Sequence, residues 1–170
     1  EKIPPLFGGG EMIQDVFEET STWAELPHKF EAGTPAIAEA IGLAEAINYI
    51  NNIGLNEIHE YEKTITKYLF EKLNQIENIE IIGPSPEIDP DRASLATFYI
   101  KNIHSNDIAE ILDSKGICIR SGHHCCQPLH RYIGIKSTAR ISMNFTTNKE
   151  EIDMFIEKLK DTIDFLKINS

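Results

Sequence analysis

The sequence predicts a mixed α/β fold: an α+β small domain with an open sheet and helices on one face, joined to the edge of a larger domain. The spacing of apolar residues changes along the chain from the helical period to the strand period. The last hundred residues or so predict the order β-β-α-β-β-α. The first 55 residues offer one strand and one helix, which cannot close a core alone. We therefore expect residues 1–55 to be a remnant of a large domain and residues 56–170 to be a C-terminal small domain.

The first segment begins with a loop rich in proline and glycine, "EKIPPLFGGGEMI", and a short strand is expected at 12–17. A helix follows, for which Thr34 is a candidate N-cap and Pro35 suits the first helical position. This helix ends near Gly54. Its apolar face, which needs a partner surface, consists of Ile37, Ile41, Ala44 and Ile47.

A second helix follows at once, with apolar residues three or four positions apart over about five turns. These residues are Ile58, Tyr61, Ile65, Leu69, Leu73 and Ile76. The period then changes to that of strands at 79–82 and 93–100, on either side of an irregular loop. A short helix is expected next, with Ser105 as N-cap and Gly116 as its stop.

Two more strands, 117–120 and 139–145, flank the segment "RSGHHCCQPLH" at 120–130, which we expect to be a loop. The final helix starts at Thr147 or Asn148, each with a glutamate three residues later, as in a capping box. Its buried stripe consists of Ile152, Phe155, Ile156, Leu159 and Ile163.

Composition limits the class of protein. Hydrophobic residues make up 41% of the chain, enough for a core, and 16 basic against 27 acidic side chains give a net charge of -11. Phosphate binding needs clustered Lys and Arg, so nucleic acid is not expected as a partner. No run of 18 apolar residues occurs, and we expect no membrane span. No signal peptide is visible, but the chain opens on Glu1 rather than Met, which leaves its true start open.

The three cysteines, Cys118, Cys125 and Cys126, do not predict a disulfide framework. Their number is odd, and adjacent cysteines can bridge only through a strained ring. A reducing compartment is therefore expected, the cytoplasm or the stroma or matrix of an organelle.

The cysteine loop is open to three interpretations besides a disulfide. A zinc site is disfavoured, because ligands within a pair are usually two to four residues apart, whereas His123 to Cys126 are contiguous. His104 and His130 could add ligands, but no CxxC or HxxxH pair exists, so we expect no metal. A reactive nucleophile is favoured, since cations such as Arg120 lower the pKa of a neighbouring thiol. Buried cysteines that only fill space remain the alternative.

Arg140 adds to the case for chemistry. It lies in the middle of an expected strand, flanked by apolar residues, and only four arginines occur in the chain. Such a residue usually lies on a solvated face, but a guanidinium fork also pairs well with a carboxylate. A thiol beside a carboxylate clamp suggests chemistry on an amino acid.

Three segments, "FEAGTP", "RSGHHCCQPL" and "STARISMNFTTNKEEID", together resemble the Suf-type (group II) cysteine desulfurases. These belong to the class V aminotransferase family of pyridoxal phosphate enzymes. The resemblance runs from Pro4 to Leu166 with the motifs in the expected order; "GHHC" followed by "QP" is specific, and "AGTP" alone is weak. It implies the C-terminal small domain of a fold-type I enzyme that uses pyridoxal 5′-phosphate.

The resemblance also implies an activity. An active-site cysteine takes sulfur from L-cysteine as a persulfide, L-alanine is released, and the sulfur passes to a Suf-type sulfur acceptor protein for iron–sulfur cluster assembly. The family's nucleophile falls on Cys125, and Cys126 is expected to be a bystander. Arg140 matches the arginine that binds the substrate carboxylate, and Arg120 and His124 belong to the same pocket.

The cofactor residues match only in part. Gly33 and Thr34 match a segment that reaches the cofactor phosphate of the neighbouring subunit in a homodimer. The "SGHK"-like motif with the cofactor lysine is not found, and Lys2 and Lys29, the only lysines before residue 63, lack its context. The chain is therefore expected to be the C-terminal portion of a desulfurase, inactive by itself. Selenocysteine lyase activity and a stand-alone sulfur carrier are the alternatives.

Overall fold

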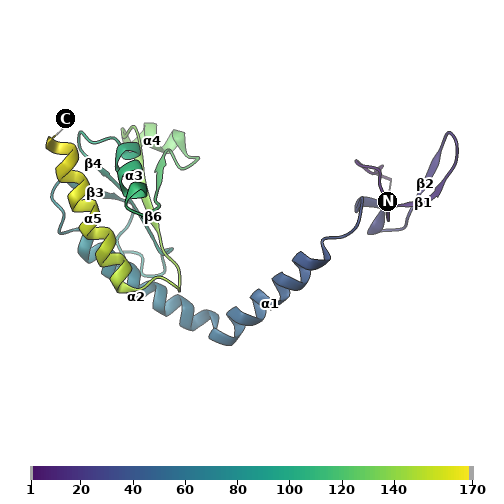
Figure 1. Ribbon diagram of the computed structural model, residues 1–170, viewed down its shortest axis with the longest axis horizontal. Coiled ribbons are helices and arrows are strands. Elements are labelled where there is room, and N and C mark those ends of the chain that lie inside the picture. The colour runs from purple at the N-terminus through teal and green to yellow at the C-terminus, as the bar shows by residue number, and fades with distance from the viewer. Residues whose placement is uncertain (1, 169–170) are drawn as a thin grey trace. The chain divides into compact units, whose positions relative to one another are not determined.

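A computed structural model of the chain describes residues 2–168. The chain forms two compact units, the first up to Asn52 and the second from Ile53 (Figure 1). The assignment of residues 1–55 to a large domain stays a prediction.

The first unit holds two short strands, a 3₁₀ turn and a long helix. Strand β1 (Ile13–Val16), which was predicted, pairs antiparallel with β2 (Ser21–Trp23), which was not. The turn η1 (His28–Phe30) and helix α1 (Ile37–Ile53) follow. The carbonyl of Gly10 accepts hydrogen bonds from the N–H groups of Met12 (2.8 Å) and Gly33 (2.9 Å). The glycine-rich loop is thus held against the segment that precedes α1.

Helix α1 starts later than the sequence predicted. The Thr34 hydroxyl makes no capping bond within the described chain, and Pro35 precedes the helix instead of opening it. The first helical hydrogen bond runs from the N–H of Ala40 to the carbonyl of Ala36 (3.0 Å). The reason is that a residue before proline favours extended backbone, so Thr34 and Pro35 continue the loop. The predicted N-cap was therefore wrong.

The apolar face of α1 is open. None of its residues is buried, and Ile37 and Ile41 are 59% and 67% exposed. Exposed apolar faces of this kind are usual at contact surfaces. This agrees with the expectation that the face needs a partner.

The second unit contains a four-stranded antiparallel sheet and four helices. The sheet has the order β3-β4-β6-β5. Its strands are β3 (Ile79–Ile82), β4 (Leu95–Ile100), β5 (Arg120–Gly122) and β6 (Thr138–Ser142). The helices are α2 (Leu55–Leu73), α3 (Ser105–Ser114), α4 (Gln127–Ile133) and α5 (Lys149–Ile168). The open sheet of the predicted α+β small domain is confirmed.

The core lies between one face of the sheet and the helices α2, α3 and α5 (Figure 1). Along β4 every second residue is buried, including Phe98, whose ring centroid lies 6.5 Å from that of Phe155 on α5. The predicted stripe of α5 is buried throughout. On α2, Ile65, Leu69 and Leu73 are buried, whereas Tyr61 is exposed.

Three local predictions differ from the structure. Ser105 does not cap α3; His104 does, because its Nδ1 accepts the N–H of Asn106 (3.2 Å). Residues 117–119 are not in a strand, and β5 begins only at Arg120. The expected loop at 120–130 contains most of α4, in which Pro128 lies at the start, where its missing N–H costs nothing.

The capping box of α5 is confirmed at Asn148, not Thr147. The Asn148 side chain accepts the N–H of Glu151 (2.8 Å), and the Glu151 carboxylate accepts the N–H of Asn148 (2.9 Å).

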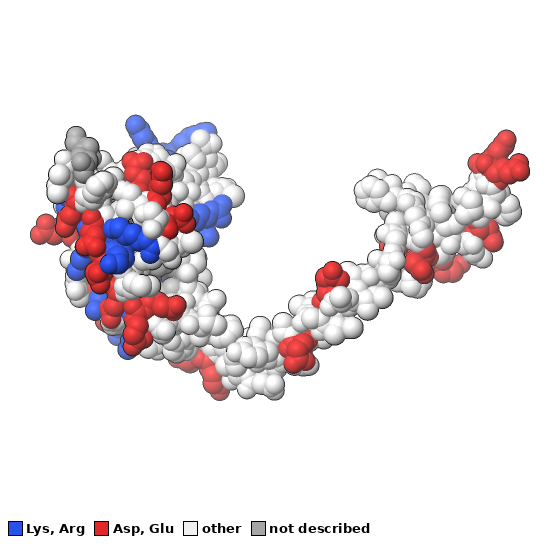
Figure 2. All heavy atoms as spheres, viewed as in Figure 1, with Lys and Arg blue, Asp and Glu red and all other residues white. Residues whose placement is uncertain are grey.

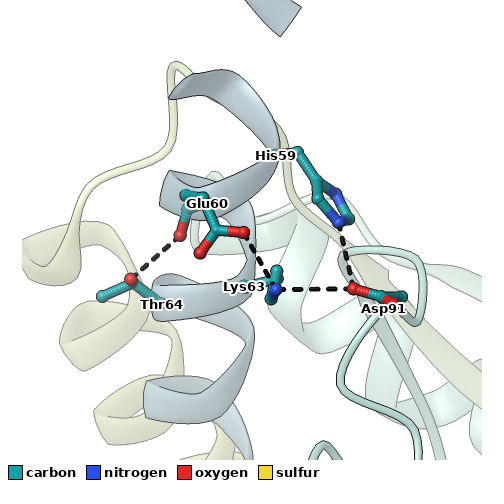
Figure 3. Close-up of polar contacts among 5 residues, drawn as sticks. All are labelled: His59, Glu60, Lys63, Thr64 and Asp91. Carbon is teal, nitrogen blue, oxygen red and sulfur yellow. Dashed lines mark hydrogen bonds and ion pairs between the residues drawn. The ribbon is translucent and has the colours of Figure 1, made fainter. Parts of the chain in front are cut away.

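A surface cluster ties α2 to the loop between β3 and β4 (Figure 3). Asp91 accepts from His59 (3.3 Å) and pairs with Lys63 (3.4 Å), which also pairs with Glu60 (2.9 Å). These contacts lower the pKa of Asp91, the hydrogen bond from His59 most. All four groups are at the surface, where such pairs contribute little to stability.

None of the helices in the described part of the chain combines the length and the apolar character needed to cross a membrane.

Candidate active site

The cysteine loop is a tight turn between β5 and α4. The N–H of Cys126 donates to the carbonyl of His123 (2.8 Å), and this bond closes the turn around His124 and Cys125. Both central residues have positive φ, 51° and 62°, as in a type I′ turn. For residues other than glycine this conformation costs about 1–2 kcal/mol per residue. Backbone strain of this kind is concentrated at functional sites. The turn presents an exposed Cys125 side chain.

His130 fixes this turn to the sheet. It lies on α4, is only 5% exposed, and spans two partners: Nδ1 is 3.1 Å from the carbonyl oxygen of Cys126, and Nε2 is 3.0 Å from Oγ1 of Thr138 on β6. Because a carbonyl can only accept, we assign the proton of the neutral ring to Nδ1, so that Nε2 accepts from the Thr138 hydroxyl. The ring of His123 packs edge-on against His130, with centroids 5.3 Å apart.

Two arginines come together through the register of the sheet. Arg120 on β5 lies directly opposite Arg140 on β6, and Arg140 lies opposite Thr97 on β4. The neighbouring pair, Phe98 and Ala139, is buried on the helix side. Since side chains alternate along a strand, the two arginines and Thr97 share the other face of the sheet.

Arg120 reaches the thiol: its Nη2 donates to Sγ of Cys125 at 3.0 Å. Arg140 is half-buried, and its buried Nε has no hydrogen-bond partner among residues 2–168. A guanidinium N–H left without an acceptor is costly unless a ligand supplies one, and a carboxylate is the acceptor whose geometry fits best. The site therefore combines the oriented thiol of Cys125 with a guanidinium group, that of Arg140, which has an N–H left to donate to an anion.

His124 is half-buried beside these cations, and both of its ring nitrogens are shielded from solvent. Neither ring nitrogen makes a hydrogen bond of normal geometry in the described chain, and the backbone of Thr138 is near enough only to raise the pKa of His124 slightly. Burial lowers the pKa of His124 below its usual value, and the charges of Arg140 and Arg120 lower it further. The ring is therefore neutral near pH 7 and has both a proton to give and a lone pair to accept one.

The other two cysteines are placed differently. Cys126 is exposed, and its side chain makes no hydrogen bond or disulfide within the described residues. Cys118 donates to the carboxylate of Asp113 (3.5 Å), and this bond raises the pKa of its thiol. Among residues 2–168 no group of three His, Cys, Asp or Glu side chains is placed to hold a metal ion.

The candidate cofactor residues lie in the first unit. Gly33 has φ 92°, and nothing lies within 4 Å of the position that a Cβ would take. A backbone that is open in this way allows close approach of a ligand, and the first N–H groups of α1 follow within a few residues. Gly33 and Thr34 thus fit an anionic group such as a phosphate.

The structure thus brings Arg120, His124, Cys125 and Arg140 into one site. Sequence reasoning missed two members. Thr97 gave no signal, because its place beside Arg140 depends on the register of the sheet. His130 was considered only as a spare metal ligand, although its position four residues after Cys126 suits a contact across one helical turn.

Comparison with known families identifies the relationship. Residues 1–155 match the profile of the family described as aminotransferase class-V. The chain belongs to this family. Over 165 residues it is 52% identical to a probable cysteine desulfurase of Synechocystis sp. and 47% identical to one of Staphylococcus aureus. Each alignment covers 97% of this chain but 39% of the relative, so the chain spans about two fifths of the length of the curated relatives it matches.

Solved structures agree with this. The apo cysteine desulfurase of Thermococcus onnurineus matches with a TM-score of 0.79 and 37% identity, over 95% of this chain and 39% of that one. The Escherichia coli cysteine desulfurase CsdA matches with the same TM-score and coverage at 26% identity. The cystine C–S lyase C-DES, at 22% identity and a TM-score of 0.67 over 92% of this chain and 38% of that one, shows the fold alone. One of its structures has glycine covalently linked to the PLP cofactor. The class-V aminotransferase fold predicted from the sequence is confirmed.

Proposed function

We propose that this chain is the C-terminal part of a cysteine desulfurase, in which Cys125 takes the sulfur of L-cysteine as a persulfide and L-alanine is released. The observation that carries the proposal is the contact between Arg120 and the Cys125 sulfur, on the same sheet face as an Arg140 whose Nε lacks an acceptor. The relatives named probable cysteine desulfurase support the reaction class. We include in the same proposal that the sulfur is delivered to a Suf-type acceptor for iron–sulfur cluster assembly, and that the complete protein is a homodimer.

Each side chain has a defined part. Arg140 binds the substrate carboxylate with its planar fork, which fixes the amino acid at the site. Arg120 orients the Cys125 sulfur through its N–H. The half-buried His124 has a lowered pKa and is neutral near pH 7, and its ring nitrogens make no hydrogen bond of normal geometry among the described residues; we propose it as the base that takes up the thiol proton of Cys125. Cys125 then forms a bond to the substrate sulfur while the bond between that sulfur and the substrate Cβ breaks. The Cβ keeps the bonding electron pair and takes up one proton, equivalent to the one lost by the thiol, which gives the methyl group of L-alanine.

The cofactor, pyridoxal 5′-phosphate, when bound would stabilise negative charge at the substrate carbon. Gly33 and Thr34 are the residues of this chain that would hold its phosphate. We assign no lysine of this chain to the cofactor, and we expect the chain alone not to turn over cysteine.

The proposal is tested in the complete protein, supplied with cofactor and L-cysteine. Cys125→Ser should abolish the protein-bound persulfide, and Cys126→Ser, the matched control one residue away, should leave most of it. Persulfides are mapped by alkylation followed by mass spectrometry of the peptide that contains both residues. A persulfide on Cys126 in the unmodified protein would overturn the assignment.

A further inference from the structure

Basic side chains concentrate around the cysteine loop of an otherwise acidic chain. Residues 114–149 contain no aspartate or glutamate, so all 27 acidic side chains lie outside this segment. Figure 2 shows red and blue spheres interspersed over α2 and α5, whereas blue spheres stand without red ones along the edge of the second unit where α4 lies. The local charge beside the thiol is therefore opposite in sign to the net charge of the chain.

This surface contains two adjoining hollows. One, of about 410 Å³, is lined by Lys101 and His104; the other, of about 350 Å³, by His123 and Arg131. They share residues 134–136, which include a third cation, Lys136, and none of the residues that line either hollow is acidic. We call this pair of hollows with α4 the basic surface. It begins at His123, two residues before Cys125.

The cations of the basic surface have no acidic partner. Lys101, Arg131 and Lys136 are exposed and make no ion pair within residues 2–168. Elsewhere in the described part of the second unit, ion pairs hold some of the lysines, as Lys63 is held by Glu60 and Asp91 (Figure 3). Unpaired cations of one sign attract a partner of the opposite sign and speed its association.

Helix α4 adds apolar contact area to this charge. Tyr132 is 89% exposed and Leu129 is 46% exposed, on the same short helix as Arg131. Tyrosine and arginine are among the residues that are enriched where the binding energy of protein interfaces concentrates. Exposed aromatic and aliphatic side chains among unpaired cations fit a protein surface better than a free small anion.

We propose that the basic surface docks an acidic segment of a partner protein, placed so that the partner faces Cys125. The proposal rests on the proposed function, because it makes the partner the protein that receives the sulfur. Nucleic acid fits less well, since the chain carries a net charge of -11 and the cations lie around two hollows rather than along a stripe.

The test uses the 170-residue chain, without cofactor or L-cysteine, and a fluorescein-labelled hexaglutamate peptide as probe. Fluorescence anisotropy should show binding at low salt that weakens as salt screens the charges. The double variant Arg131→Glu/Lys136→Glu should weaken binding by roughly tenfold or more. The matched control Lys67→Glu/Lys160→Glu makes the same change in net charge on the exposed faces of α2 and α5 and should bind as the unmodified chain does. If the charge-reversed variant fails to fold, Arg131→Gln/Lys136→Gln takes its place.

A second readout connects binding to the thiol. Bound hexaglutamate should slow alkylation of Cys125 and leave that of Cys118 unchanged. Equal binding by the test and control variants, or no binding at low salt, would overturn the proposal, and so would tighter binding of a twelve-nucleotide oligothymidine. None of these outcomes depends on persulfide formation, so a failure of the docking proposal is distinguishable from a failure of the proposed function.

Discussion

Replacing His130 with methionine tests how the cysteine turn is held. Methionine is flexible and fills space well, but it removes both hydrogen bonds of the imidazole. Thr138 is 1% exposed, so leaving its buried hydroxyl without a partner costs about 1–3 kcal/mol. The Cys126 carbonyl keeps the backbone N–H of His130 as a donor (3.3 Å), so there only about 0.5–1.5 kcal/mol is lost. Together we expect a loss of roughly 2–4 kcal/mol in the free energy of unfolding.

Urea unfolding of the 170-residue chain, followed by circular dichroism, gives this free energy. Thr138→Val supplies the control. The double variant His130→Met/Thr138→Val removes both partners of the bond between these side chains, so neither is left buried without a hydrogen-bond partner. The double variant should therefore be less destabilised than the sum of the single variants, with a coupling of about 0.5–3 kcal/mol. Strict additivity would refute the inference that His130 and Thr138 act as a pair. Alkylation of Cys125, compared with that of Cys118, should change in His130→Met, because the turn that orients the thiol loses its attachment to β6.

Three further predictions concern single residues. In the complete protein, Arg140→Gln should weaken L-cysteine binding by about 1.5–3 kcal/mol, and Arg140→Lys should restore only part of it; an unchanged KM in both would exclude the carboxylate clamp. The pKa of His124 is lowered in the folded chain, so the unfolded chain binds a proton at this ring more readily than the folded chain does. The stability that the neutral ring contributes is therefore complete above pH 6.5 and is lost as the pH falls below that value. His124→Gln should accordingly flatten the fall in unfolding free energy between about pH 7 and pH 5, and an unchanged slope would contradict the burial of a neutral ring. Asn148→Ala should cost about 1 kcal/mol of unfolding free energy, whereas Asn148→Asp, which keeps an acceptor at the N-cap, should cost little.

Periodicity predicted the elements that are long and half-buried. The α5 stripe and the alternation along β4 follow directly from which positions must face a core. Helix α4 was missed because seven residues give too few turns to show a period, and Pro128 suggested a loop exit although it also suits a helix start. The N-cap of α3 was assigned to Ser105 because serine is a common cap, whereas the side chain that accepts the bond is a histidine.

In the candidate site, too, some features could be predicted from the sequence and others depended on the fold. The motif indicated Cys125 and Arg140 and placed Arg120 near them, but the approach of the two arginines depends on strand register, which residue spacing does not contain. Burial of His130 depends on α4, an element that the sequence did not show. Residue types therefore indicated which side chains to consider for the candidate site, whereas the contacts that hold these side chains depend on the fold.

The strand order has a consequence for how the chain acquires its site during synthesis. Strand β5 pairs only with β6, which leaves the ribosome after it, and the residue that attaches the turn to the sheet, Thr138, belongs to β6 as well. A nascent chain that ends anywhere before residue 138 therefore carries the thiol of Cys125 on a segment with no strand to pair with. The thiol of Cys125 is therefore synthesised before the strand on which its position depends. A chain interrupted at this stage would expose an unconstrained vicinal pair of thiols, Cys125 and Cys126, to oxidation before the strained turn has formed.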